Sequence, residues 1–132
     1  MYLLDTDTLI YCLKGKEAVV KNLENHQYDV LRISVISLME LYYGAYKSER
    51  VTANVSKVCR IESSFDVLPV DFSIAETFGM VKSQFEAHGK PLDDFDLAIA
   101  ASALTFNLIL VSNNEKHFSR IEGLRLANWT KC

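Results

Sequence analysis

Short apolar segments alternate with longer segments of helical periodicity along this chain, and this alternation constrains its fold more than any other feature. The apolar segments are expected to form strands at residues 2–4, 30–35, 67–70, 108–111 and 124–127. Parallel neighbours in a sheet need a crossover connection, which is usually a helix. The alternation therefore predicts an α/β fold with a mainly parallel central sheet.

The predicted helices begin and end at residues with known capping preferences. Thr6 or Asp7 is expected to cap the first helix, and Asp93 or Asp94 the helix before the fourth strand. Asn107 is predicted to follow that helix in a left-handed conformation. Helices are expected over 8–13, 17–25, 36–46, 50–64, 73–88 and 94–106, with a short one near 118 and breaks at 14–16 and 89–91.

Length and charge limit the possible classes of protein. The 132 residues suit one domain, 1–132, and no apolar run approaches the roughly 18 residues of a membrane span. The first residues lack the features of a secretion signal, so we expect a cytoplasmic protein. Cys12, Cys59 and Cys132 match no zinc pattern and are expected to be free thiols. The net charge of −3 argues against binding RNA by positive charge alone, but an enzyme with metal-neutralised acids is compatible with it.

Asp5 is the first candidate for a functional acid. It follows the predicted strand 2–4 directly, and ligands of open α/β sheets bind at the carboxyl ends of the strands. Aspartate is also a preferred helix cap, so a purely capping role for Asp5 or Asp7 is the alternative.

Glu40 is the second candidate. Ser37 and Glu40 have the spacing of a capping box, in which the glutamate only satisfies the start of a helix. Ser73 and Glu76 have the same spacing and are assigned to capping. Glu40 differs because residues 36–46 around it are almost wholly apolar, and a carboxylate in apolar surroundings needs a partner or a metal.

Asp96 is the third candidate. It lies in the first turn of a helix whose residues 97–101 are apolar, which predicts burial of that helix. The helix dipole favours a negative charge at this position, and Asp93 lies on the same face. The alternative is that Asp93 or Asp94 caps the helix and Asp96 is a solvated neighbour.

If these acids converge, they can bind Mg²⁺ or Mn²⁺, which prefer oxygen ligands. A bound metal can activate a water molecule for attack at phosphorus, without a covalent intermediate. Asn114 follows the strand 108–111 and is a weaker candidate ligand, with a turn residue as the alternative. His117 alone is expected to be a surface residue.

Together these segments resemble the PIN domain family, and more narrowly the VapC-type toxins of toxin–antitoxin pairs. The resemblance covers the whole chain in order, and is carried by residues 2–7, 37–41, 91–101, 111–114, Phe118 and 123–129. The family often has an acid where Asn114 stands, and many members have one at the position of His117.

The resemblance implies a three-layer α/β/α fold and a metal-dependent endoribonuclease with catalytic acids at Asp5, Glu40 and Asp96. It implies Mg²⁺ as cofactor, or Mn²⁺, with Asn114 as an additional, weaker ligand. It also implies a homodimer, a VapB-like antitoxin as partner, and RNA as substrate, in several family members tRNA.

Two other functions fit parts of the sequence. The segment 4–9 resembles the opening motif of haloacid-dehalogenase-like phosphatases, with Asp5 as nucleophile and Asp7 as general acid. That alternative leaves Glu40 unexplained. A non-catalytic PIN-like module that binds RNA or protein is the second alternative, supported by the amide at Asn114.

Overall fold

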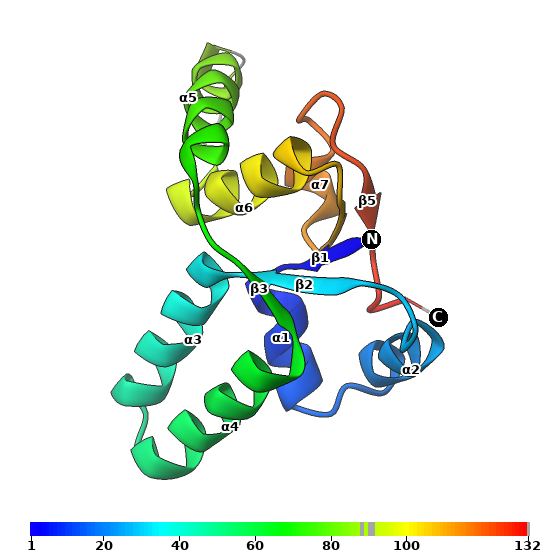
Figure 1. Ribbon diagram of the computed structural model, residues 1–132, viewed down its shortest axis with the longest axis vertical. Coiled ribbons are helices and arrows are strands. Elements are labelled where there is room, and N and C mark those ends of the chain that lie inside the picture. The colour runs from blue at the N-terminus through cyan, green and yellow to red at the C-terminus, as the bar shows by residue number, and fades with distance from the viewer. Residues whose placement is uncertain (88, 90–91, 132) are drawn as a thin grey trace.

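The structure is a computed structural model that describes residues 1–87, 89 and 92–131, and these form five strands and seven helices (Figure 1). The strand order is β3-β2-β1-β4-β5, and every neighbouring pair is parallel. The strands are β1 (Tyr2–Leu4), β2 (Leu31–Ser34), β3 (Asp66–Leu68), β4 (Ile109–Val111) and β5 (Leu126–Ala127). The α/β fold with a mainly parallel sheet is confirmed.

Helices cover both faces of the sheet, as the three-layer prediction requires (Figure 1). One face carries α1 (Thr6–Leu13), α2 (Glu17–Asn25), α3 (Val35–Lys47) and α4 (Val51–Ser64). The other carries α5 (Phe72–Ala87), α6 (Asp94–Thr105) and α7 (Glu115–Phe118). No helix among the described residues combines the length and apolar character needed to cross a membrane.

Each face of the sheet has its own hydrophobic core. Leu3 and Leu4 are both fully buried, but Leu3 packs with α5 and α6 whereas Leu4 packs with α1, α3 and α4. Successive side chains of a strand point to opposite faces, so β1 is the centre of both cores. Helix α6 is buried on several sides, from Leu97 to Ala103, which confirms the prediction from its apolar run.

Three predicted helix starts are wrong, each because an earlier side chain caps the helix. Asp5, and not Thr6 or Asp7, caps α1 by accepting the N–H of Thr8 at 2.8 Å. Ser34 caps α3 by accepting the N–H of Ile36, which places Ser37 inside the helix. Asp71, and not Ser73, accepts the N–H of Ile74 at the start of α5. The Ser73–Glu76 capping box is therefore not formed.

Other boundaries differ by a few residues for physical reasons. The strand expected over 67–70 is β3 at Asp66–Leu68, because Pro69 has no N–H for a sheet hydrogen bond. Asn107 has the predicted left-handed conformation, with φ of 54°. Of the break expected at 89–91, Gly89 has φ of 124°, while Lys90 and Pro91 lie outside the described residues, as do His88 and Cys132.

Candidate active site

The order of the strands creates a topological switch point at the carboxyl end of β1, where successive connections change from one side of the strand to the other. From β1 the chain passes to β2 and β3 on one side and returns through α5 and α6 to β4 on the other. Ligands of open α/β sheets bind in the crevice at such a point. The two strand ends meet there, since the N–H of Asp5, the first residue after β1, donates to the carbonyl of Val111, the last residue of β4, at 3.0 Å.

Asp5 combines two roles that the sequence presented as alternatives. Its carboxylate caps α1, yet the residue is only 5% exposed and lies at the switch point. Burial raises the pKa of Asp5, while hydrogen bonds from Ser112 and Thr8 oppose this shift and the charge of Asp7 adds to it. A capping bond to one carboxylate oxygen is thus compatible with a functional position.

Glu40 is held by a residue from another element. Its Oε1 accepts a 2.7 Å hydrogen bond from the Thr6 hydroxyl, which also lies 3.0 Å from Ser37 Oγ. The glutamate therefore does not close a capping box. Burial raises the pKa of Glu40 most strongly, against the lowering by Thr6, and the charges of Asp93, Asp7 and Asp5 raise it further.

Asp96 is half-buried in the first turn of α6. Burial, followed by repulsion from Asp93, Glu40 and Asp5, raises its pKa to about 6. Asp94 instead forms an ion pair with Lys82 at 2.9 Å. Asp93 occupies the cap position without a side-chain capping bond. Asp96 is therefore not the solvated neighbour that the alternative required.

Electrostatic repulsion connects the three predicted acids with each other and with two more. We call these residues the acid cluster: Asp5, Asp7, Glu40, Asp93 and Asp96. Charges of other members raise the pKa of each of the three predicted acids. The members belong to α1, α3 and α6 or to the cap positions of these helices. The resulting local negative charge is the main electrostatic feature of the site.

Sequence reasoning missed two hydroxyl residues that contact the cluster, Thr6 and Ser112. Thr6 stands between Asp5 and Asp7, and its bond to Glu40 joins positions 34 residues apart. Ser112 is completely buried directly after β4. Their position just beyond neighbouring central strands is the signal that could have identified them.

The donor atoms of the acid cluster are all carboxylate oxygens. Within the described part of the chain, no three histidine, cysteine or acidic side chains are grouped closely enough to hold an ion directly. The donors are carboxylates whose raised pKa values reflect uncompensated burial and repulsion. Mg²⁺ usually keeps several waters and takes one or two carboxylates, so this donor set fits a partly hydrated divalent ion.

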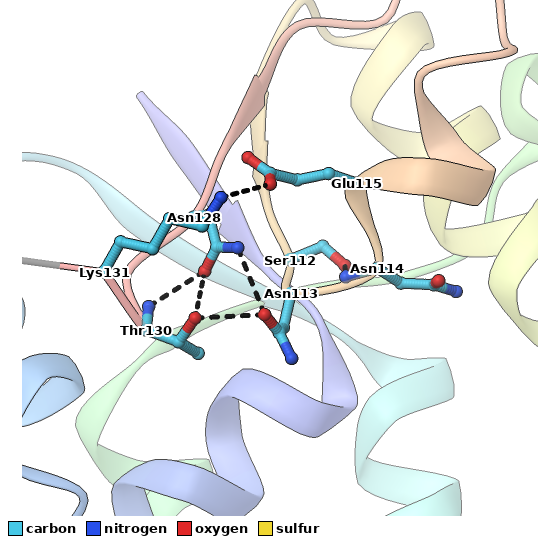
Figure 2. Close-up of polar contacts among 7 residues, drawn as sticks. All are labelled: Ser112, Asn113, Asn114, Glu115, Asn128, Thr130 and Lys131. Carbon is cyan, nitrogen blue, oxygen red and sulfur yellow. Dashed lines mark hydrogen bonds and ion pairs between the residues drawn. The ribbon is translucent and has the colours of Figure 1, made fainter.

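Asn114 and His117 lie on the segment that follows β4. Asn114 is half-buried at the cap position of α7, where its side chain makes no capping bond, and its N–H donates to Ser112 Oγ at 2.9 Å. Its amide extends away from the neighbouring Asn113 contacts (Figure 2). His117 is exposed and is not among the groups that shift the pKa of the predicted acids.

A groove of 390 Å³ begins beside Glu40 and runs between α1, α3 and α4. Its apolar lining includes Leu13, Leu41 and Val58, and Lys14 and Lys57 add positive charge. Neither lysine forms an ion pair with another described residue. The groove therefore presents cations next to the acid cluster.

A family model and individual relatives both match the chain over nearly its whole length, and they indicate the same family. The PIN domain model matches residues 2–124. The chain is 36% identical to the tRNA(fMet)-specific endonuclease VapC of Shigella flexneri over 129 residues, covering 98% of each chain. It is also 36% identical to ribonuclease VapC2 of Haemophilus influenzae, covering 97% of each.

Solved structures agree with this result. DNA-bound VapBC from Salmonella typhimurium matches with a TM-score of 0.91 and 34% identity, covering 97% of both chains. VapBC2 from Rickettsia felis, bound to a promoter DNA fragment, has a TM-score of 0.91 and 33% identity over 97% of this chain and 98% of the other. The phosphatase alternative is therefore wrong, and the chain belongs to the PIN domain family, among its VapC-type members.

Proposed function

We propose that the chain is a divalent-metal-dependent endoribonuclease, the toxin of a VapBC-type toxin–antitoxin pair, which acts as one PIN-like domain over 1–132. The mutual charge repulsion among Asp5, Glu40 and Asp96, with Asp5 at the switch point, supports this proposal. Buried carboxylates that repel one another lower stability unless a cation neutralises them. The full-length similarity to proteins named VapC ribonucleases supports the reaction class.

The proposed cofactor is Mg²⁺ or Mn²⁺, held by Asp5, Glu40 and Asp96 in part through its bound waters, with Asn114 as a weaker neutral ligand. When bound, the metal supplies an activated water and stabilises charge at phosphorus. The residues of the chain orient this site. Thr6 holds one oxygen of Glu40, and the Thr8 N–H holds one oxygen of Asp5, so each carboxylate keeps a defined direction.

RNA is the proposed substrate, and the groove beside Glu40 offers a means of binding it. The net charge of −3 and the acid cluster both repel a polyanion, so binding requires local cations. Lys14 and Lys57 provide them at the groove. The name of the Shigella relative supports tRNA as the class of RNA.

The proposed partners are a VapB-like antitoxin and a second copy of the chain, in the cytoplasm. The solved relatives are VapBC complexes, which supports an antitoxin partner. An exposed apolar face on α3, with Met39 at 50% and Tyr43 at 66% exposure, is available for protein contacts.

Cleavage of RNA by the purified chain tests the proposal. We expect cleavage of a tRNA mixture with Mg²⁺ or Mn²⁺, loss of cleavage with EDTA, and recovery when metal is added back. Asp96→Asn should be inactive under all these conditions and serves as the matched control for contaminating nucleases. Binding of RNA without cleavage, at every metal concentration, would overturn the enzyme and favour a non-catalytic module.

A further inference from the structure

The last described residues of the chain are hydrogen-bonded to the segment that carries Asn114. We call residues 128–131 the tail and residues 112–115 the site loop (Figure 2). Asn113 Oδ1 accepts a hydrogen bond from Asn128 Nδ2 at 3.1 Å. The Thr130 hydroxyl lies 3.0 Å from Asn113 Oδ1 and 2.5 Å from Asn128 Oδ1, so its single proton is shared between the loop and the tail. Asn128 Oδ1 in turn accepts the N–H of Thr130 at 2.9 Å, which folds the tail back on itself.

A second contact joins the tail and the loop, but it contributes less. Lys131 Nζ lies 3.0 Å from Glu115 Oε2, and both side chains are substantially exposed, at 70% and 41%. Exposed ion pairs are screened by solvent and contribute little. The amide and hydroxyl contacts of Asn113 are also exposed, but they join the loop to two tail residues at once, Asn128 and Thr130.

The tail is anchored in the body of the protein and can act as a support. Trp129 is 3% exposed and stacks on the His26 ring, with centroids 4.8 Å apart. The Asn22 amide on α2 donates to the Trp129 carbonyl at 3.1 Å. The preceding strand β5 pairs with β4, and the Ser112 N–H donates to the Ala127 carbonyl at 2.9 Å. The tail is thus held from two sides before it reaches the site loop.

The site loop connects this support to the acid cluster. Ser112 is completely buried beside Asp5, and its Oγ accepts the N–H of Asn114. The side chains of Asn113 and Asn114 extend in different directions, the first toward the tail and the second away from it (Figure 2). Of these two adjacent residues, Asn113 bonds to the tail, whereas the side chain of Asn114 makes no polar contact with the tail residues 128–131 (Figure 2).

We propose that Asn113, Asn128 and Thr130 are positioning residues, which hold the site loop so that Ser112 stays against Asp5 and Asn114 keeps its place at the switch point. The proposal rests on the proposed ribonuclease function for its catalytic consequence. The positioning itself is a property of the folded chain and can be measured without substrate.

The test compares Thr130→Val, which removes the hydroxyl at nearly constant volume, with Thr130→Ser, which keeps it. Thr130→Val should lower kcat by roughly tenfold with KM unchanged, because displacement of a ligand-bearing loop affects the reaction more than substrate binding. Thr130→Ser should retain parental kcat. Thr105→Val is the matched control, since that hydroxyl also bonds two partners, Thr77 Oγ1 and the Ala101 carbonyl, within the distant α5–α6 packing. It should lower the melting temperature without lowering kcat.

Two further measurements separate positioning from general destabilisation. In an Asn114→Ala background, Thr130→Val should lower kcat by a clearly smaller factor than in the parent, because part of its effect acts through Asn114. Hydrogen exchange at the Asn114 N–H should accelerate in Thr130→Val and not in Thr105→Val. The proposal would be overturned if Thr130→Val kept the parental kcat and the parental rate of hydrogen exchange at Asn114. It would also be overturned if the two substitutions lowered kcat by independent factors that multiply in the double variant. If the parent cleaves no RNA, the proposed function fails, and the exchange measurement alone decides whether the tail positions the loop.

Discussion

The Thr6 hydroxyl donates a 2.7 Å hydrogen bond to Glu40 Oε1, so the residue that begins α1 orients an acid in the interior of α3. Thr6 follows Asp5 in the chain, and Asp5 caps the same helix. One short segment therefore supplies an acid of the cluster and a hydrogen bond that orients another. The arrangement makes the proposed catalysis sensitive to a residue that is not acidic.

Removing the Thr6 hydroxyl should reduce ribonuclease activity without abolishing it. A hydrogen bond to a charged group contributes roughly 1.5–3 kcal/mol, so Thr6→Val should lower kcat by about tenfold or more. Thr6→Ser keeps the donor and should stay within about twofold of the parent. Steady-state kinetics on a fluorogenic RNA would measure both variants. Equal losses in Thr6→Val and Thr6→Ser would show that the methyl group matters and the hydrogen bond does not.

Glu40 and Asp96 should be individually essential. Glu40→Ala and Asp96→Ala should each lower kcat by more than about a hundredfold, since metal stabilisation of the transition state contributes several kcal/mol. Asn114→Ala should lose less, and Asn114→Asp should tighten Mn²⁺ binding by adding a charge. Calorimetric titration with Mn²⁺ checks affinity, and circular dichroism checks that each variant folds. Full activity in Glu40→Ala would remove Glu40 from the site.

The acid cluster should make the metal-free protein less stable as the pH rises. Asp96 has a folded pKa of about 6 against an ordinary value of 3.8, so between these values the folded state binds a proton that the unfolded chain has lost. The free energy of unfolding therefore falls as the pH rises through this window.

Thermal melts of parent and Asp96→Asn at pH 5 and pH 7 check this sign. Asp96→Asn should stabilise the metal-free form at pH 7 by about 1 kcal/mol, a figure reduced for the partial exposure of the side chain. Mn²⁺ should raise the melting temperature of the parent, and much less that of the variant. A parent indifferent to Mn²⁺ and a destabilised Asp96→Asn would contradict a shared site.

Reversing the charge of a groove lysine should weaken binding of RNA. Lys57→Glu should raise KM by about fivefold at low salt with a smaller change in kcat, and the difference should shrink as salt screens the contact. Lys21→Glu makes the same charge change on the exposed surface of α2, away from the groove, and is the control. The same KM for both variants would indicate only a general effect of net charge.

Expression in bacteria without a partner should arrest growth if the chain is a toxin. Asp96→Asn, produced at the same level, should allow normal growth. Colony counts and immunoblots together give the result. Normal growth with abundant soluble parent protein would count against the toxin assignment and would leave the in vitro nuclease assay as a separate question.

Much of this architecture follows from local sequence, because strand length, apolar alternation and helix periodicity are local properties. The parallel sheet was predicted from the order of elements, and the burial of α6 from its run of apolar residues. Helix starts were less predictable, because several Asp and Ser residues competed for each cap. Only the folded backbone selects Asp5, Ser34 and Asp71.

For the proposed site, the sequence predicts candidate acids but not the residues that support them. Asp5, Glu40 and Asp96 stand out because carboxylates are unusual in apolar surroundings. The partner of Glu40 is 34 residues away in the chain, and the tail contacts of Asn113 span 15 and 17 residues. The supporting residues Thr6, Asn128 and Thr130 are neutral and polar and have no distinctive local pattern, so only the three-dimensional structure reveals them.

The capping bond of Asp5 affects how an inert form of this protein should be prepared for capturing bound RNA. Alanine at this position removes the acid and also the acceptor for the Thr8 N–H, and loss of a cap typically costs about 1 kcal/mol. Asparagine caps helices as well as aspartate does, and it carries no charge. Asp5→Asn is therefore the better choice for trapping a substrate complex for crystallography, because it replaces the carboxylate with a neutral amide and keeps the cap of the first turn of α1.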